Sequence, residues 1–521
     1  MTHRSAAPQA FVFSALALAL AVTSRPSAAQ QAAAPAPEPA KPAEPTPAPA
    51  ADAAPAEPAP APAPVAAPPA PVVAAPAPAP APAETPAWYA RAPLTISSGT
   101  GEHELALTFY GFLQADYIHD TTRSYNDAIN DTLVARTDTY EGTVGRTQFS
   151  TRNTRLGLHF KSPSIGGVQP TAVLEGDFFG NQPATSESAY FNSGTFRLRH
   201  AYVKLANEYV DVLVGQTYDL FGWQNHFFPA TAEFLGVPNQ VYSRNTQLRL
   251  SKTLGSEDGV GVTLGAAAVR PVQRDSQMPD INAGIRLDVG SWKGITTPGS
   301  NSTTALPLSL GVSGVVRQLK VDAFAPPPTQ TANGITAWGV SIDALLPVIA
   351  ARDSEDRGNK LTLSGSFVMG SGIGDLITAT GGARFPTLPN PAQANPPPEY
   401  AGNIDNGIVT FDRYGLLHTI DWQAFRAGLQ YYLPPSGRVS ISINYTQATS
   451  KNMRDLYPQG GAEIELLTHV AEMSRYADVN LFWDVTPAVR LGLAGAYSAV
   501  EYLDGDKPHN IRLHGQALYA F

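Results

Sequence analysis

Arginine recurs at alternate positions of short segments whose other alternate positions are apolar. The planar guanidinium group can bind a carboxylate or a phosphate through two parallel hydrogen bonds. If the apolar side chains of each segment face one medium and the arginines another, the arginines form a set that could recognise small anions. The candidate anion-binding residues are Arg155, Arg197, Arg199, Arg249, Arg286 and Arg426.

Acidic side chains share these segments and leave two interpretations open. The candidate acids are Asp116, Glu175 and Asp177. They could pair with the arginines and hold a wall together, or they could lie apart from them and give a pore one basic and one acidic side. Arg197 and Arg199 have the parity of the apolar Val203 and Leu205, so they share a face with the other arginines only if a β-bulge near His200 intervenes.

Signals for an enzyme are poor. His103-Glu104 lacks the second histidine of a zinc-protease motif, no nucleophile elbow or phosphate-binding glycine loop is present, and the ten histidines are scattered. We therefore predict no enzymatic activity, no metal and no cofactor. A formal net charge of −9 gives no support for nucleic-acid binding, which favours a basic surface.

The amino-terminal part of the chain differs in composition from the rest. Residues 1–29 combine Arg4, an apolar run and small residues before Gln30, which predicts a secretory signal peptide. Residues 30–86 are almost only alanine and proline and predict an extended, disordered linker, followed by a join over 87–103. This linker could be a passive tether or an arm that reaches peptidoglycan or a protein. Because the chain has no cysteine, we expect no disulfides.

From residue 104 onward the dominant pattern is a two-residue alternation of apolar and polar side chains. About sixteen such segments follow, and 196–222 shows the pattern as a hairpin with a turn at Asn207–Glu208. Bacterial outer-membrane barrels typically have an even number of such strands, and their connections alternate between short turns and long loops. The fold class predicted for 104–521 is therefore all-β, a transmembrane antiparallel β-barrel. One gap, 291–306, is too long for a short turn and indicates a slip in the predicted register.

The last segment ends on an aromatic residue. Tyr519 and Phe521 share the apolar face of this final strand. We interpret them as a carboxy-terminal assembly signal that is read by the barrel-assembly machinery.

Several stretches resemble one family, the DcaP-like outer-membrane porins, and more distantly the phosphate-selective porins. The matching residues are YGFLQADYIHD at 110–120, TRNTRLGLHF at 151–160, LEGDFFG at 174–180, FRLRHAYVKL at 196–205, VGQTYDLFG at 214–222 and RNTQLRLS at 244–251. The resemblance implies a trimer of sixteen-stranded barrels in a Gram-negative outer membrane. It also implies that the third long loop, 218–243, folds into the barrel and narrows it, with Asp219, Glu233 and Asn239 at the constriction; the alternative is a loop that lies over the rim.

The function predicted from these observations is a porin that allows passive diffusion of small hydrophilic solutes and prefers small carboxylates or phosphate-like anions. Its expected partners are outer-membrane lipid, two further copies of the chain in a homotrimer, the assembly machinery and small anionic solutes. The alternative is a structural tether that links the outer membrane to peptidoglycan through the arm, which would lie in the periplasm. The family pattern has a helical periplasmic segment where this chain has the alanine and proline linker.

Overall fold

We analysed a computed structural model, which describes residues 93–129, 133–180, 186–256, 258–271, 276–299, 302–322, 332–380, 407–411, 417–456 and 471–521. The predicted signal peptide 1–29, the linker 30–86 and the first six residues of the join lie outside the described residues.

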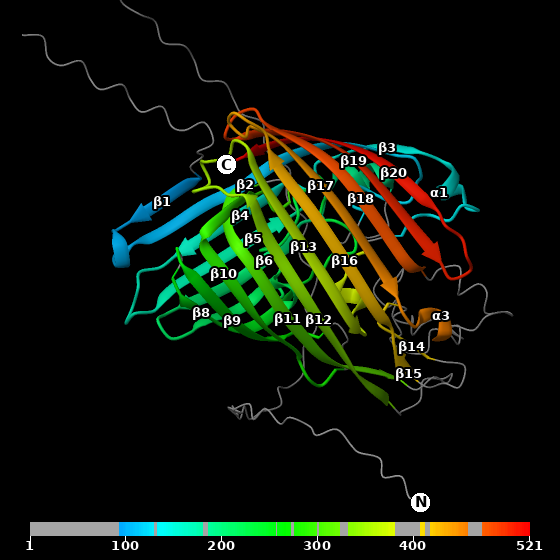
Figure 1. The fold of residues 1–521 in the computed structure, drawn as a ribbon, viewed down its shortest axis with the longest axis horizontal. Helices are drawn as coiled ribbons and strands as arrows, with labels where there is room; N and C mark the ends of the chain where they lie inside the picture. The colour runs from blue at the N-terminus through cyan, green and yellow to red at the C-terminus, as the bar shows by residue number, and fades with distance from the viewer. Residues whose placement is uncertain are drawn as a thin grey trace, which may run out of the picture. The chain divides into compact units, whose positions relative to one another are not determined.

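The described residues form a closed antiparallel β-barrel of sixteen strands, as the sequence predicts (Figure 1). The barrel strands are β2 (Leu105–Asp120), β3 (Arg146–Ser150) continued by β4 (Arg155–Lys161), β5 (Gln169–Asp177), β6 (Arg197–Ala206), β7 (Asp211–Tyr218), β8 (Arg244–Gly255), β9 (Val260–Val269), β10 (Asp280–Thr296), β11 (Thr304–Asp322), β12 (Ala332–Ile349), β13 (Lys360–Ser371), β16 (Asp421–Tyr432), β17 (Val439–Ser450), β18 (Ala471–Asp484), β19 (Val489–Tyr502) and β20 (His509–Ala520). β3 and β4 count as one strand because both pair with β2.

Short elements accompany the barrel. They are β1 (Leu94–Ser98), the small hairpin of β14 (Val409–Phe411) and β15 (Leu417–Thr419), the helices α1 (Tyr140–Thr143), α2 (Glu187–Asn192) and α3 (Met453–Leu456), and the 3-10 turns η1 (Gly101–His103), η2 (Phe221–Trp223) and η3 (Gly374–Leu376). No helix in the described ranges is long and apolar enough to cross a membrane.

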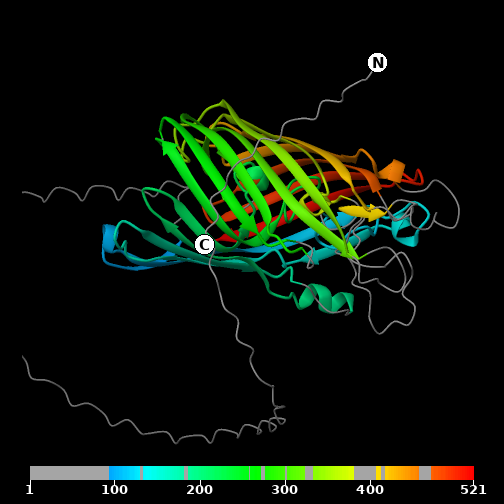
Figure 2. The same cartoon turned by 90° about the horizontal axis from the view of Figure 1, so that it is seen from below.

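The barrel closes where its last strand pairs with its first. Ala520 lies opposite Phe112 and Arg512 opposite Asp120, so β20 covers the second half of β2. β1 pairs with the first half, from Leu105 to Phe109. Closure satisfies the backbone groups of these strands, which is the condition for spanning a lipid bilayer with β-structure. Figure 2 shows the strands curving round a common interior.

The two-residue alternation separates an apolar outer face from a polar inner face. On β20, Ile511 and Leu513 are 52% and 45% exposed, whereas Arg512 and His514 between them are 1% and 0% exposed. A strand places successive side chains on opposite faces, so this difference follows directly from the sequence pattern. The outer face is the one that lipid would cover.

The two ends of the barrel differ in the length of their connections. One end carries the turns 207–210, 256–259 and 485–488, and the other carries the longer connections 121–145 and 219–243. We call them the short-turn end and the long-loop end.

A β-bulge at Arg199 brings both arginines of β6 to the inner face. Glu175 pairs with His200, but the next residue, Gly176, pairs with Leu198, so Arg199 is the extra residue on its strand. On the outer face the Gln216 amide donates a hydrogen bond of 2.9 Å to the Leu198 carbonyl beside the bulge. The bulge near His200, which the sequence left open, is therefore present.

The gap at 291–306, which is too long for a short turn, also has a structural cause. β10 and β11 are longer than the predicted strands 281–290 and 307–318, because they continue to pair beyond an irregularity between Val289 and Lys293. The connection left between them is only 297–303. The slip in the predicted register at this gap is thereby confirmed, because the bulge breaks the alternation on which the strand ends were judged.

Candidate functional site in the barrel lumen

The connection between β7 and β8, residues 219–243, folds into the barrel. We call it loop 3. Its apolar side chains are buried, with Phe221, Phe227, Phe234 and Val237 all at 2% exposure or less. A loop over the rim would leave such residues in water, so their burial accounts for the inward path.

Loop 3 first follows the inner face of β11. The Gly222 amide donates to the Ser313 hydroxyl at 2.7 Å, and the Trp223 indole donates to the Val312 carbonyl at 3.1 Å. These bonds give the loop direct attachment to a strand that is not its neighbour in the chain.

The middle of loop 3 crosses to the opposite wall. The Ala230 carbonyl accepts from the Asn444 amide of β17 at 2.7 Å, and the Thr231 hydroxyl donates to the Asp478 carboxylate of β18 at 2.7 Å. The loop therefore covers the inner face of the barrel from β11 to β18.

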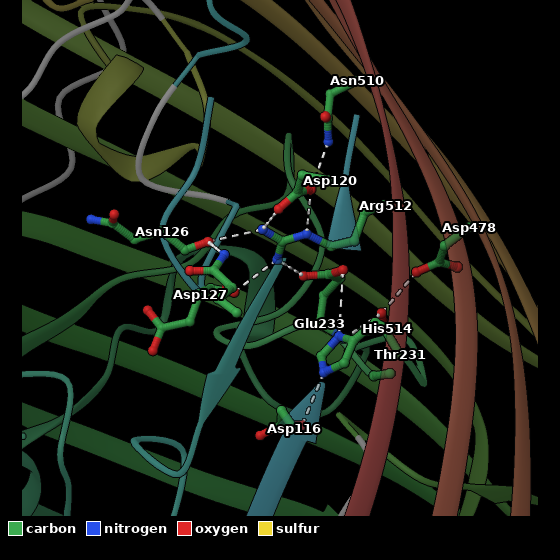
Figure 3. Close-up of polar contacts among 12 residues, drawn as sticks. Asp116, Asp120, Asn126, Asp127, Thr231, Glu233, Asp478, Asn510, Arg512 and His514 are labelled. Atoms are coloured by element: carbon green, nitrogen blue, oxygen red, sulfur yellow. Dashed lines mark hydrogen bonds and ion pairs between the residues drawn. The ribbon is translucent and has the colours of Figure 1, made fainter. Parts of the chain in front are cut away.

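Glu233 connects loop 3 to the barrel seam (Figure 3). Its carboxylate lies 3.1 Å from Arg512 Nη1, and both side chains are almost completely buried. Arg512 also makes two bonds of 2.9 Å to Asp120 and donates to the main-chain carbonyls of Asn126 and Asp127 at 3.0 and 2.7 Å. Burial alone would raise the pKa of Glu233, but the Arg512 guanidinium and the neighbouring His514 hold it below its usual value.

Asp116 belongs to the same buried cluster. Its carboxylate lies 2.9 Å from His514 Nε2, and the other ring nitrogen of His514 is 3.7 Å from Glu233. Asp116 is 3% exposed. It therefore supports the attachment of loop 3 and does not face the open lumen.

The other two loop candidates also fasten the loop. Asp219 accepts hydrogen bonds of 2.7 Å from the Ser243 hydroxyl and the Asn245 amide, which closes the base of the loop. Asn239 donates to the Thr446 hydroxyl at 3.2 Å and to the Ser474 carbonyl at 3.3 Å. Of the predicted set Asp219, Glu233 and Asn239, only Glu233 borders the cavity described below.

The backbone of loop 3 is held in uncommon conformations. Trp223, Asn225, Leu235 and Asn239 have positive φ values of 41°, 75°, 61° and 63°. A positive φ raises the conformational energy of a non-glycine residue by roughly 1–2 kcal/mol. Such a conformation persists only where contacts with the surrounding structure hold the backbone in place. The attachments to four distant strands provide that restraint.

An open cavity of about 510 Å3 remains between loop 3 and the part of the wall that the loop does not cover. On the wall side it is lined by Tyr110, Arg155, Glu175, Arg199 and His200. A hollow of about 650 Å3 on the outer apolar face, lined by residues such as Leu250 and Ile285, belongs to the lipid-facing surface.

Salt bridges organise this uncovered wall. Arg199 lies 2.7 Å from Glu175 and 3.0 Å from Asp177, and Arg197 binds Asp177 through two bonds of 2.9 and 2.7 Å. Arg155 Nε is 3.5 Å from Glu175. These five side chains therefore form one network.

Arg244 adds a further positive charge that the sequence reasoning did not select. Its guanidinium lies over the rings of Tyr218 and Tyr242, at 5.9 and 5.6 Å from the ring centres. Burial alone would raise the pKa of Tyr242, but Arg244 and the two arginines of β6 hold it below its usual value. The signal that could have found Arg244 is its place at the start of a strand immediately after the long aromatic loop.

We call the set Arg155, Glu175, Asp177, Arg197, Arg199 and Arg244 the basic wall. It holds four guanidinium groups and two carboxylates, an excess of two positive charges. Among the described residues no hydrogen-bond acceptor reaches Arg155 Nε or Arg244 Nη1, although both atoms are buried. Two nitrogen atoms of the basic wall are thus left without a hydrogen-bond acceptor, although Arg155 Nε keeps its ion pair with Glu175 at 3.5 Å.

Of the predicted arginines, Arg155 and Arg199 border the cavity, whereas Arg197, Arg249, Arg286 and Arg426 do not. Arg286 makes bonds of 3.0 Å to Asp288, Arg249 binds the Gln247 side chain and the Tyr218 carbonyl, and Arg426 donates to the Phe227 carbonyl at 2.7 Å. Arg286 and Arg249 support the wall, and Arg426 attaches loop 3. These arginines lie on the inner face of their strands, but side-chain and main-chain groups of the protein already accept hydrogen bonds from them.

The carboxy-terminal residues lie at the seam. Tyr519 faces outward and is 51% exposed. Phe521 exchanges two main-chain hydrogen bonds with Gly111, both of 3.1 Å. A Cβ on Gly111 would lie 3.1 Å from the Phe521 ring, so the ring packs over the glycine.

A closed sixteen-stranded antiparallel barrel with an apolar outer face, a charged interior and a long loop folded inside has the architecture of the porins. No family model matches the chain, and no curated protein matches it in sequence. Among solved structures it is similar in fold to the outer membrane channel DcaP of Acinetobacter baumannii, with a TM-score of 0.55 and 17% identity over 80% of this chain and 97% of that one. This likeness confirms, at the level of fold, the resemblance seen in the sequence.

Two further structures are similar at lower scores. An anion-selective porin from Comamonas acidovorans gives a TM-score of 0.42 and 12% identity over 80% of this chain and 100% of that one. OmpF of Salmonella typhi gives a TM-score of 0.44 and 11% identity over 82% of this chain and 100% of that one.

Proposed function

We propose that the chain is an outer-membrane porin that conducts small hydrophilic solutes passively and prefers anions. The observation that supports this preference is that Arg155 and Arg199 line the open cavity and belong to a network in which four arginines outnumber two carboxylates. Rings of arginine or lysine are the usual basis of anion selectivity in pores. Passive transport is the only activity in this proposal.

The charge beside the cavity matters more for permeation than the net charge of the chain. The negative total of −9 is spread over the whole sequence. Permeation depends instead on the field at the narrowest section, where low-dielectric walls focus the potential and raise the local concentration of ions of opposite sign. Loop 3 narrows the lumen, and Arg155 and Arg199 of the basic wall line the cavity that remains beside it.

The solutes that fit this wall are small carboxylates and phosphate-like anions. Such groups match the fork of donors on a guanidinium group. Arg155 Nε and Arg244 Nη1 are the donors for which the described residues supply no acceptor. Of these two residues, Arg155 lines the open cavity, where a permeating anion would meet its side chain.

We also propose an orientation for the barrel in the outer membrane and an oligomeric state. The short-turn end faces the periplasm, because outer-membrane barrels have short periplasmic turns, and the amino-terminal arm then lies there. The functional unit is a homotrimer, delivered by the barrel-assembly machinery through Tyr519 and Phe521.

The test is a reversal-potential measurement on purified protein in a planar bilayer under a salt gradient. We expect a reversal potential of the sign that anion preference gives, and a lower salt current when small dicarboxylates are added, because they occupy the basic wall. A cation-selective pore would contradict the anion preference, and an absence of conductance would contradict the porin function.

Deleting 30–86 separates this function from the tether that the sequence left open. The porin proposal expects conductance to survive the deletion, with unchanged attachment of the envelope. Loss of attachment with unchanged conductance would favour the tether.

A further inference from the structure

The hairpin of β10 and β11 bends into the lumen at the short-turn end. We call residues 293–299 and 302–306 the inward hairpin. The irregular pairing between Val289 and Lys293 marks where it leaves the plane of the barrel wall, since a bulge bends its strand. The Trp292 indole, just before it, donates to the Pro347 carbonyl of β12 at 2.7 Å.

One face of the inward hairpin rests on the inner wall. Ile295 and Ala305 pack with Ala351 and Tyr432. A Cβ on Gly294 would lie 2.5 Å from the Thr362 hydroxyl of β13, so the absence of a side chain permits this close approach.

The turn of the inward hairpin reaches strands that are remote from β10 and β11 in the barrel. The Thr297 amide donates to the Gln430 side chain of β16 at 2.9 Å. Arg490 of β19 donates to the Thr303 hydroxyl at 3.2 Å. Since β12 and β13 lie between β11 and β16, and β17 and β18 between β16 and β19, the hairpin crosses the short-turn opening.

The turn also meets loop 3, which enters from the other end. The Gly299 amide donates to the Pro229 carbonyl at 3.0 Å, and the Thr231 amide donates to the Gly299 carbonyl at 3.2 Å. Gly299 has φ of 67°, a left-handed conformation that glycine adopts without steric cost. Two segments folded inward from opposite ends are thus joined by main-chain hydrogen bonds.

The other face of the inward hairpin borders the open cavity. Pro298, Gly299, Ser302, Thr304 and Leu306 line the same space as Arg155 and Arg199 of the basic wall. None of these hairpin side chains carries a charge.

We propose that the inward hairpin is the second half of the constriction and that Ser302, Thr304 and Leu306 help to determine which solutes pass. Loop 3 and the inward hairpin together form the side of the channel opposite the basic wall. The hairpin itself carries no charge, so it limits the size of the solute without cancelling the attraction of the arginines for anions. The one acid of loop 3 that borders the cavity, Glu233, is paired with Arg512. This inference rests on the proposed porin function.

The absence of cysteine from the chain permits a direct test. Thr304→Cys and Ser302→Cys each introduce a single thiol on the cavity face of the inward hairpin. Ser354→Cys is the matched control, because Ser354 is an exposed serine in another connection at the same end, 350–359. Each protein is recorded in a bilayer before and after reaction with a cationic or an anionic methanethiosulfonate, and mass spectrometry verifies the modification.

We expect modification at residue 304 or 302 to lower the single-channel conductance about twofold, because added volume at the narrowest section obstructs it. The cationic reagent should increase the anion preference and the anionic reagent should reduce it. The control should show neither change. Ser302 is exposed, so its replacement tests the inference even if Thr304→Cys fails to fold.

The failure of this inference is distinct from the failure of the proposed function. A parent protein that does not conduct contradicts the porin function itself. A parent that conducts, combined with full modification of both cysteine variants and no change in conductance or selectivity, overturns the role of the inward hairpin.

Discussion

Replacing Arg155 with glutamine should reduce the anion preference of the channel while leaving the barrel folded. Arg155 borders the cavity, and its Nε lies 3.5 Å from Glu175. Glu175 keeps its bond of 2.7 Å to Arg199 in the variant, so no buried carboxylate loses its only partner. The substitution therefore changes the charge of the basic wall more than its structure.

The size of the effect follows from the charges on the basic wall. Removing one guanidinium halves its excess of two positive charges. For an ion about 8 Å away, one unit charge contributes about 0.5 kcal/mol at the dielectric constant of water and about 2 kcal/mol at an effective value of about 20. These energies correspond to a change in the permeability ratio of about twofold to about thirtyfold.

The assay is the reversal potential under a salt gradient at low ionic strength, because the Debye length is only about 10 Å at 0.1 M. Glu175→Gln should shift the ratio in the opposite direction, since it raises the excess of positive charge. Arg286→Gln is the control, because Arg286 binds Asp288 and lies away from the cavity. An unchanged ratio for Arg155→Gln, or an equal shift for the control, would refute the reasoning.

Three further predictions concern assembly and the attachment of loop 3. Arg512→Met leaves Asp120 and Glu233 buried without their guanidinium partner, which should destabilise the protein by about 3–5 kcal/mol. We expect a lower unfolding temperature on heat-modifiability gels and larger, noisier single-channel currents. A variant whose single-channel current matches that of the parent protein would show that the attachment of loop 3 does not depend on Arg512. Deleting Phe521 removes two main-chain bonds at the seam and should lower the yield of detergent-resistant barrel; equal yields would contradict this. Leu493→Arg places a charge on the outer face, where Leu493 is 52% exposed, and should destabilise the barrel by about 2–4 kcal/mol in a urea titration, whereas Leu493→Met should cost less than about 1.5 kcal/mol.

The strands were predictable because their signal is local. Ile511 and Leu513 alternate with Arg512 and His514 in the sequence, and the same residues separate into exposed and buried sets in the barrel. The bulge at Arg199 was left open by the sequence, in which the arginines of β6 have the same parity as its apolar residues, and the structure decided it. The strand ends near Val289 were not predictable, because a bulge interrupts the alternation that identifies them.

The roles of the charged residues were harder to predict from the sequence. Arg155, Arg286 and Arg426 have the same residue type and equivalent strand positions, yet only Arg155 borders the cavity. Arg426 donates instead to a carbonyl of loop 3, 199 residues earlier in the chain. No local pattern encodes such a contact, because it depends on where a distant segment comes to lie.

The sequence by itself therefore determined the barrel, the approximate number of its strands, its two chemically different faces and the seam at its last strand. These properties follow from the geometry of the extended backbone, which repeats every two residues whatever the rest of the chain does. Only the tertiary structure decided which lumen charges meet the open cavity. That outcome depends on the paths of loop 3 and of the inward hairpin, which are fixed by contacts such as Glu233 with Arg512, 279 residues apart, and Gly299 with Thr231.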